Sequence, residues 1–372
     1  MTDGGSRKMA TAMRKTVLWI AALGVLAAAA AIGVRLAVKP QAAEKAQTPP
    51  APYQNPVFEP VLADPSVIRG EDGWFYAYGT EDTWDDGAAH LIPIIRSRNL
   101  TEWEFVRDAF ETKPDWKDEG WLWAPDISFN EETGKYYLYY SYSTWGDPNP
   151  GIGVATADAP DGPFTDHGPL FTSETIGVAN SIDPFWFRDD DGTPYLIWGS
   201  FHGIYGIELS ADGLATAGEK FQIADNQFEA PYIVKRGDFY YFFGSVGSCC
   251  EGAFSSYHVK VGRAESIRGP FTDRDGRDLL LGGGTTILAA NAVPDQEGRQ
   301  FVGPGHNAVV TDDAGGDWIV YHAIDTDEPT LLTGATRRPM MIDPLIWEDG
   351  WPTVHQQEPG TAPQPGPVVR EN

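Results

Sequence analysis

The sequence predicts an all-β protein folded as a five-bladed β-propeller, and three observations support this prediction. A turn glycine leads into an aromatic-rich apolar strand at five places in the 372-residue chain. A shorter strand that opens with a polar residue precedes each glycine, with the polar residue 8 to 10 positions upstream. The five units lie between Asn55 and His355 and are about 60 residues each, which suits a blade of four antiparallel strands.

The aromatic segments are expected to form the second strand of each blade. In chain order they are residues 73–80, 134–141, 192–200, 237–245 and 316–323. Some are apolar at nearly every position, as in the run from Tyr136 to Tyr140, whereas a sheet with one wet face would alternate. We therefore interpret these aromatic side chains as core between blades and not as a binding site.

The polar residue that opens each preceding strand is a carboxylate in four units and a histidine in the fifth. These residues are Asp64, Asp126, Asp183, Glu229 and His306. Because the first strand of each blade lines the central channel, residues in one register should meet at one mouth of the channel. A single Asp-Pro usually shapes a turn. Five polar residues in one register instead favour a functional site. Gathered carboxylates destabilise a fold and have raised pKa values, and such an arrangement usually persists because it serves chemistry.

Composition and motifs exclude several classes of function. The chain has 27 Lys and Arg against 53 Asp and Glu, a formal net charge of −26. Binding to nucleic acid or to an anionic membrane surface needs a basic face, so neither partner is expected. Two cysteines are too few for a disulfide framework or a cysteine-based zinc site. The chain also contains no nucleophile elbow, phosphate-binding loop, dinucleotide fingerprint or His-Glu-x-x-His pair.

The N-terminus is expected to be separate from the propeller. Residues 1–38 are predicted to be an export signal or an uncleaved signal anchor, because basic residues flank an uncharged apolar run from Thr16 to Val34. We assign residues 39–56 to a Pro/Ala-rich linker, 57–355 to the propeller and 356–372 to a C-terminal tail. The propeller is then secreted, periplasmic or membrane-anchored outside the cytoplasm, with membrane contact only through an uncleaved N-terminal segment. A monomer is expected.

The ring of acids suggests a reaction. Hydrolysis of a glycosidic bond uses one carboxylic acid to protonate the leaving oxygen and one carboxylate to activate water. Aromatic residues that can stack on sugar rings lie just before or after the first strands: Trp121, Trp123, Trp145, Phe185 and Phe201. The pattern therefore favours a carbohydrate-active enzyme.

A set of short motifs occurs in a characteristic order between residues 60 and 352. They are Ala63-Asp-Pro-Ser66, Trp123-Ala-Pro-Asp126, Asn180-Ser-Ile-Asp-Pro184, Phe228-Glu-Ala-Pro231 and Gly303-Pro-Gly-His-Asn307. In this order they resemble glycoside hydrolase family 43, whose members are inverting five-bladed propellers. The resemblance implies Asp64 as general base, Glu229 as general acid and Asp183 as the residue that orients the acid and tunes its pKa.

Within that family the chain is most similar to the endo-α-1,5-L-arabinanase-like group, on segments 198–201, 203–209 and 248–258. The resemblance implies inverting cleavage of α-1,5-linked L-arabinan, a plant cell-wall polysaccharide, or of its oligosaccharides. Substrate contacts are expected from Trp123, Asp126, Asn180, Phe201, Cys249 and Cys250. Ala63, where many arabinanases have histidine, and residues 333–341 depart from the pattern, so an exo-acting α-L-arabinofuranosidase or a β-xylosidase stays open.

Two further features stay open. Cys249 and Cys250 are adjacent, and they are either a vicinal disulfide that walls the sugar site or two separate buried thiols. His306 is either a hydrogen-bonded channel residue or, as the resemblance implies, part of a calcium site on the propeller axis. One imidazole is a poor cage for a hard cation, so water would have to supply most of the ligands.

Two alternatives belong to other classes. One is a non-catalytic carbohydrate-binding propeller, which is expected if one of the three acids lies away from the channel. The other is a retaining fructan- or sucrose-processing propeller with a similar trio of acids. Its usual motifs differ from the Ala-Asp-Pro-Ser and Glu-Ala-Pro found here.

Overall fold

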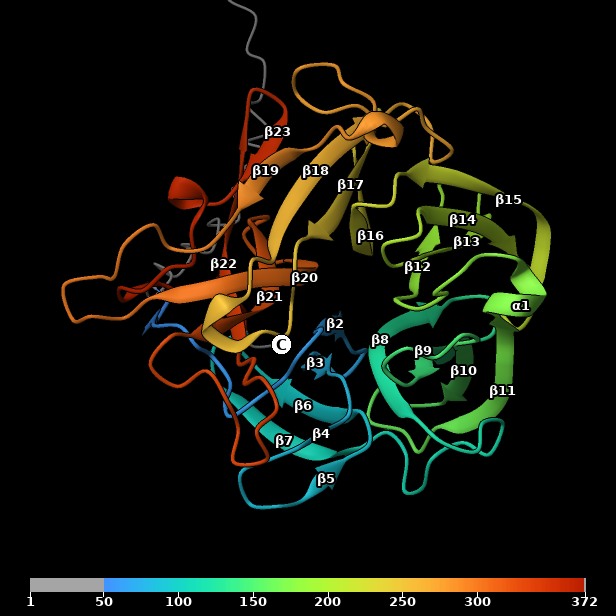
Figure 1. Cartoon of the computed structure of the whole chain (residues 1–372), viewed down its shortest axis with the longest axis horizontal. Coiled ribbons are helices and arrows are strands. Elements are labelled where there is room, and N and C mark those ends of the chain that lie inside the picture. Colours follow the sequence, from blue (N-terminus) through green and yellow to red (C-terminus); the bar gives the residue numbers. More distant parts are fainter. Residues whose placement is uncertain (1–49, 371–372) are drawn as a thin grey trace, which may run out of the picture. The chain divides into compact units, whose positions relative to one another are not determined.

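The computed structural model describes residues 50–370 and confirms the five-bladed β-propeller (Figure 1). Five four-stranded antiparallel sheets surround a central axis, and within each sheet the strands follow their order in the chain. The first strands of neighbouring blades contact one another. They therefore line the axis, as the sequence predicts.

The blades have the following strands. Blade 1 has β2 (Ser66–Arg69), β3 (Phe75–Tyr78), β6 (Pro93–Ser97) and β7 (Trp103–Asp108). Blade 2 has β8 (Trp121–Asn130), β9 (Lys135–Ser143), β10 (Gly151–Ala157) and β11 (Thr165–Thr172). Blade 3 has β12 (Phe185–Arg188), β13 (Pro194–Trp198), β14 (Ile204–Leu209) and β15 (Thr216–Ala224). Blade 4 has β16 (Phe228–Arg236), β17 (Phe239–Val246), β18 (His258–Ala264) and β19 (Thr285–Leu288). Blade 5 has β20 (Phe301–Thr311), β21 (Asp317–Asp325), β22 (Met340–Glu348) and β23 (Trp351–Thr353).

Short elements complete the described chain. Two additional strand pairs are β1 (Pro52–Tyr53) with β24 (Gln364–Pro365) and β4 (Asp82–Thr83) with β5 (Ala89–His90). The helical turns are α1 (Ser173–Ile176), η1 (Gly252–Phe254), η2 (Leu279–Leu281) and η3 (His355–Gln357).

The aromatic second strands form the core, as predicted. Every residue of β3 is buried, and so are Tyr136 to Tyr140 on β9. These side chains belong to hydrophobic clusters that draw residues from two neighbouring blades, for example Tyr76 of β3 together with Tyr140 of β9. Because both faces of the sheets are covered, the strands do not need polar residues at alternate positions.

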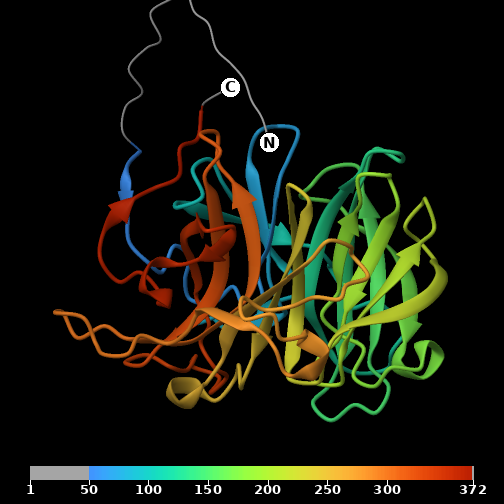
Figure 2. The same cartoon turned by 90° about the horizontal axis from the view of Figure 1, so that it is seen from above.

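The structure changes the predicted limits of the linker and the tail. β1 pairs antiparallel with β24 (Figure 2). Pro52 lies opposite Pro365 in this pair. The buried carboxylate of Asp343 on β22 accepts hydrogen bonds from Asn55 Nδ2 (3.1 Å), Gln364 Nε2 (2.7 Å) and the Tyr321 hydroxyl (2.6 Å). Residues on both sides of the predicted 57–355 domain therefore pack against blade 5 as part of the fold.

No helix within residues 50–370 is long and apolar enough to cross a membrane. The predicted export segment, residues 1–38, lies outside the described residues.

Candidate active site

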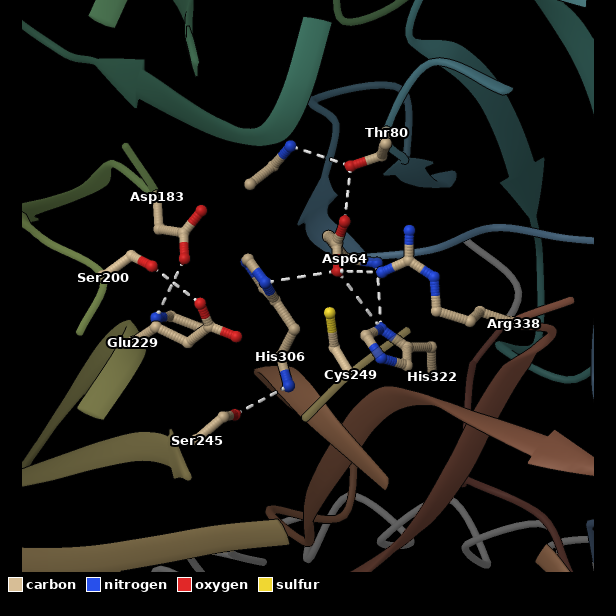
Figure 3. A network of polar contacts seen from close by, with 12 residues as sticks. Asp64, Thr80, Asp183, Ser200, Glu229, Ser245, Cys249, His306, His322 and Arg338 are labelled. Atoms are coloured by element: carbon tan, nitrogen blue, oxygen red, sulfur yellow. Dashed lines mark hydrogen bonds and ion pairs between the residues drawn. The ribbon is translucent and has the colours of Figure 1, made fainter. Parts of the chain in front are cut away.

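One mouth of the propeller axis holds a cavity of about 480 Å³, and four of the five predicted polar residues line it. Asp64 lies two residues before β2, and Asp183 lies two residues before β12. Glu229 lies on β16 and His306 lies on β20. Figure 3 shows these side chains gathered from separate blades, with Asp64 on one side of His306 and the pair of Asp183 and Glu229 on the other. The prediction that the repeat brings them together is confirmed for these four.

The chain bends at the same place in every blade. Asp64, Ala124, Asp183, Ala230 and His306 all have left-handed backbone conformations, with φ between 45° and 58°. Such values are uncommon for residues other than glycine. In four of the five blades the next residue is proline. These bent residues therefore mark equivalent positions in the five blades. Glu229 lies one position before the bend of its blade, and Asp126 lies two positions after the bend of its blade.

Asp126 does not line the catalytic cavity, and its predicted place in the ring and its predicted substrate contact are corrected. Its carboxylate accepts hydrogen bonds from Ser66 Oγ (3.0 Å) and from the backbone N–H of Trp186 (2.8 Å). It borders a narrow channel that His306 and Asn307 also line. Burial raises the pKa of Asp126 to about 7. The physical reason is the register: two residues past the bend, the side chain lies inside the propeller.

Asp64 is a buried carboxylate with a hydrogen bond to each oxygen. Thr80 Oγ1 donates to Oδ2 (2.5 Å), and Arg338 Nη1 donates to Oδ1 (2.9 Å). Burial alone would raise the pKa of Asp64, but the charges of Arg338 and His306 outweigh burial and hold the pKa well below its ordinary value. Asp64 is therefore ionised at neutral pH.

His322 packs behind Asp64 as a neutral imidazole. Its Nδ1 accepts the backbone N–H of Asp64 (3.1 Å) and lies 3.3 Å from Asp64 Oδ1. Burial is the main cause that lowers the pKa of His322 to about 4. The ring lies nearly parallel to that of Tyr257, with an angle of 10° and centroids 5.8 Å apart. His322 thus holds the backbone of Asp64 in place without adding a charge.

Asp183 and Glu229 have a different environment. Glu229 Oε2 accepts a hydrogen bond from Ser200 Oγ (2.8 Å), and Asp183 Oδ2 accepts the backbone N–H of Ala230 (3.1 Å). Burial is the largest effect on both carboxyls, and the neighbouring carboxylates add to it. Together they raise the pKa of Asp183 to about 8 and the pKa of Glu229 above its ordinary value. Because Asp183 binds the peptide next to Glu229, it positions that side chain as well as affecting its charge.

His306 stands between the two groups. Its Nδ1 lies 3.3 Å from Asp64 Oδ1, and its backbone N–H donates to Ser245 Oγ (2.9 Å). Burial would lower the pKa of His306, but Asp64 and the other carboxylates outweigh this and raise it.

Comparison with known proteins decides the family. The model of glycosyl hydrolases family 43 matches residues 53–352. The chain belongs to glycoside hydrolase family 43. It is accordingly a glycoside hydrolase, and its propeller is that of the family 43 arabinanases among the solved structures.

Individual relatives of this family 43 enzyme cover most of its length. It is 32% identical over 325 residues to the extracellular exo-α-(1→5)-L-arabinofuranosidase ArbA of Cellvibrio japonicus, covering 79% of this chain and 86% of the relative. It is 31% identical over 310 residues to extracellular endo-α-(1→5)-L-arabinanase 1 of Bacillus subtilis, covering 79% and 87%. The structure of Cellvibrio cellulosa α-L-arabinanase complexed with arabinohexaose matches with a TM-score of 0.68 and 32% identity, over 80% and 97% of the two chains.

The other predicted contact residues do line the cavity of this glycoside hydrolase. They are Trp123, Asn180, Phe201, Cys249 and Cys250. Asn180 Nδ2 donates to Ser200 Oγ (3.0 Å), the same hydroxyl that contacts Glu229. Cys249 and Cys250 are joined by a disulfide bond, which decides between the two alternatives for these cysteines.

Sequence reasoning missed five residues that support the acids: Thr80, Ser200, Tyr257, His322 and Arg338. Arg338 falls in the segment 333–341 that matched no family motif, and it is 274 positions from Asp64. A signal for it existed, because a buried carboxylate that must stay ionised requires a cation nearby. The position of that cation could not be read from the repeat.

The residues at the axis offer few direct ligands for a metal ion. Within residues 50–370, no group of three or more His, Cys, Asp and Glu side chains is placed to hold a metal ion. Both amide atoms of the buried Asn307 side chain have no hydrogen-bond partner among the described residues, and Asn307 lines the narrow channel with His306 and Asp126. This donor set fits a hydrated ion held mainly through water and does not fit a protein-made cage.

Proposed function

We propose that the chain hydrolyses α-1,5-linked L-arabinan with inversion of the anomeric configuration. The observation that carries this proposal is the asymmetry of the carboxyl groups across one cavity. Arg338 contacts Asp64 at 2.9 Å and lowers the pKa of Asp64, whereas Glu229 contacts the uncharged Ser200 hydroxyl and burial raises the pKa of Glu229. The names of the relatives support arabinan as the polymer, because they are arabinanases and an arabinofuranosidase that act on α-1,5 linkages.

The mechanism follows from these opposite pKa shifts. Glu229 donates its proton to the glycosidic oxygen as the bond from that oxygen to the anomeric carbon breaks, and the bond electrons remain on the oxygen. Asp64 takes a proton from a water molecule whose oxygen attacks the anomeric carbon from the opposite side. Thr80 and Arg338 each bind one oxygen of Asp64, so the carboxylate that receives the proton is held in one orientation. Proton exchange with solvent then resets both carboxyls.

Attack within the polymer is proposed over attack at its ends. A second cavity joins the catalytic cavity at residues Thr80 and Arg338, beside Asp64, while Phe201 and Asn180 border the catalytic cavity alone. A chain therefore has room on both sides of the cleaved bond. Sizing the early products from linear arabinan tests this, since internal attack gives a range of long fragments. Release of one short product from the outset, or preference for xylan or aryl xylosides, would favour the exo-arabinofuranosidase or β-xylosidase alternative.

The enzyme is proposed to act outside the cytoplasm. The relatives named above are extracellular, and residues 1–38 have the charge and apolar pattern of an export segment. Expression of the full chain in a bacterial host, followed by fractionation, tests this. Activity confined to the cytoplasmic fraction would contradict it.

A hydrated calcium ion on the axis is proposed to bind through His306, with waters as the remaining ligands. When bound, it would lower the electrostatic cost of gathering carboxylates. Chelation should then lower the melting temperature and the activity, and His306→Ala should remove the sensitivity to chelator. An unchanged melting temperature after exhaustive chelation would leave His306 as a hydrogen-bonding residue of the channel.

A further inference from the structure

A second cavity of about 460 Å³ lies beside the catalytic cavity. The two cavities share five lining residues: Thr80, Trp123, Trp145, Cys250 and Arg338. They are therefore connected as one groove. Beyond the shared residues, the second cavity is lined by Trp121, Glu81, Asp82 and residues 333–336.

Three tryptophans follow this groove, and two of them are unusually exposed. Trp121 has 46% of its surface exposed and Trp145 has 75%. The rings of Trp121 and Trp123 are parallel within 4° at a centroid distance of 6.5 Å, and Trp145 lies 5.5 Å from Trp123. An exposed indole leaves a large apolar surface in contact with water, which is unfavourable. A row of them along a groove is typical of a site where a ligand covers the rings.

The backbone on both sides of Trp121 is held in place. Glu81 Oε2 accepts the backbone N–H of Leu122 (2.9 Å), and Lys113 Nζ donates to the carbonyl of Gly120 (2.5 Å). Lys113 and Glu81 also form an ion pair of 2.6 Å. Trp121 is therefore presented by a fixed segment of chain, even though its indole is half exposed.

The opposite wall comes from blade 5. Thr336 Oγ1 donates to the carbonyl of Cys250 (2.9 Å) and accepts the backbone N–H of Gly252 (3.3 Å). These bonds fix residues 333–336 against the disulfide loop. The wall supplies hydroxyl groups and Asp82 supplies a carboxylate, so polar groups that can bind sugar hydroxyls line the same cavity as the aromatic row.

The location of the second cavity sets which part of a substrate it can hold. Thr80 and Arg338, which line both cavities, are the two hydrogen-bond donors to Asp64. Glu229 and Ser200 line the catalytic cavity only. In an inverting hydrolysis the leaving group departs on the side of the acid, away from the base. The second cavity therefore lies away from the leaving group.

We propose that Trp121, with Asp82 and the residue 333–336 wall, forms a distal subsite for furanosyl units on the non-reducing side of the cleaved bond. This inference rests on the proposed arabinan hydrolysis and adds the direction in which the substrate lies. The subsite affects substrates according to the length of their glycone, because only the longer ones reach Trp121.

The experiment uses 4-nitrophenyl glycosides with one, two or three α-1,5-linked arabinofuranosyl units, so that the leaving group is constant. For Trp121→Ala, the ratio of kcat/KM between the three-unit and the one-unit glycoside should fall roughly tenfold, mostly through KM, as expected for loss of one ring contact. Trp121→Phe should restore most of the ratio. Phe254→Ala removes an aromatic side chain that is 87% exposed and lines neither cavity, and it should leave all three rates unchanged.

The outcomes separate the two proposals. If the wild type hydrolyses these glycosides and Trp121→Ala lowers all three rates equally, or lowers none, the distal subsite is wrong. A loss that grows instead with length on the reducing-end side, measured with end-labelled oligosaccharides, overturns the direction. If the wild type hydrolyses no arabinofuranoside at all, the proposed function itself fails.

Discussion

The two halves of the active site place carboxyl groups at similar depth and shift their pKa values in opposite directions. Asp64 is 8% exposed and Glu229 is also 8% exposed. Asp64 has the guanidinium of Arg338 at 2.9 Å, whereas Glu229 and Asp183 accept hydrogen bonds from the uncharged Ser200 hydroxyl and Ala230 backbone N–H. Burial is thus common to both halves, and the presence of a cation decides which carboxyl is the base.

The largest effects are expected from removing the two catalytic carboxyls. Glu229→Gln should lower kcat about 10²–10⁴-fold on arabinan, because the leaving oxygen is no longer protonated. The loss should be smaller for 4-nitrophenyl glycosides, whose leaving group needs little protonation. Asp64→Asn should lower kcat at least as much on every substrate. Equal losses for Glu229→Gln on both kinds of substrate would contradict its role as the acid.

The next largest effect tests the cation that distinguishes the Asp64 half. Arg338→Ala removes the guanidinium, whose charge lowers the pKa of Asp64 most, and breaking a buried pair of this kind costs about 3–5 kcal/mol of stability. The displaced base should lower kcat about 100-fold. Arg338→Lys should recover part of kcat and of the melting temperature. A variant that melts earlier but keeps the wild-type kcat below its melting temperature would reduce Arg338 to a structural role.

The other half is tested by Asp183→Asn. The amide oxygen of asparagine can still accept the N–H of Ala230, so Glu229 stays in place. The substitution removes the neighbouring carboxyl, whose pKa is raised to about 8, so Glu229 no longer titrates beside a second buried acid. The pKa of Glu229 should then fall, and the alkaline limb of the kcat profile should move to lower pH, since the acid loses its proton earlier. We expect a loss of about tenfold at the wild-type optimum. An alkaline limb that stays in place or moves to higher pH would contradict the coupling.

The smallest effect is expected outside both halves, at Asp126. Asparagine can accept the N–H of Trp186 with its oxygen and donate to Ser66 with its nitrogen, so both hydrogen bonds survive. Asp126→Asn should therefore change kcat and KM by less than about threefold. A large rise in KM would restore the substrate contact that the sequence suggested.

The sequence predicted the features that recur in every blade. Glycines and aromatic runs repeat because each blade needs the same turn and the same core, and Asp64, Asp183 and Glu229 occur in recognisable motifs. The error at Asp126 arose from counting back from the turn glycine, whereas the bend before proline marks the register. Aligning the four Ala-Pro and Asp-Pro pairs would have shown that Asp126 is displaced by two positions.

The features that were missed depend on closure of the ring. Arg338 contacts Asp64 from the last blade. β1 pairs with β24, although the two strands lie near opposite ends of the described sequence. Neither contact repeats, and the strands of the closing pair have two residues each, too few to give a periodic pattern. Long-range pairing of single residues has no local signal, so only the folded structure reveals it.

In the proposed mechanism Asp64 activates water and does not attack the sugar itself. Proton NMR of the first minutes of arabino-oligosaccharide hydrolysis tests this directly, because it resolves the anomer that forms before mutarotation. Since the bonds cleaved are α-linked, inversion predicts that the β-anomer of the new reducing end appears first. Initial appearance of the α-anomer would show retention, would make Asp64 a nucleophile, and would contradict the assignment of base and acid to the two halves of the site.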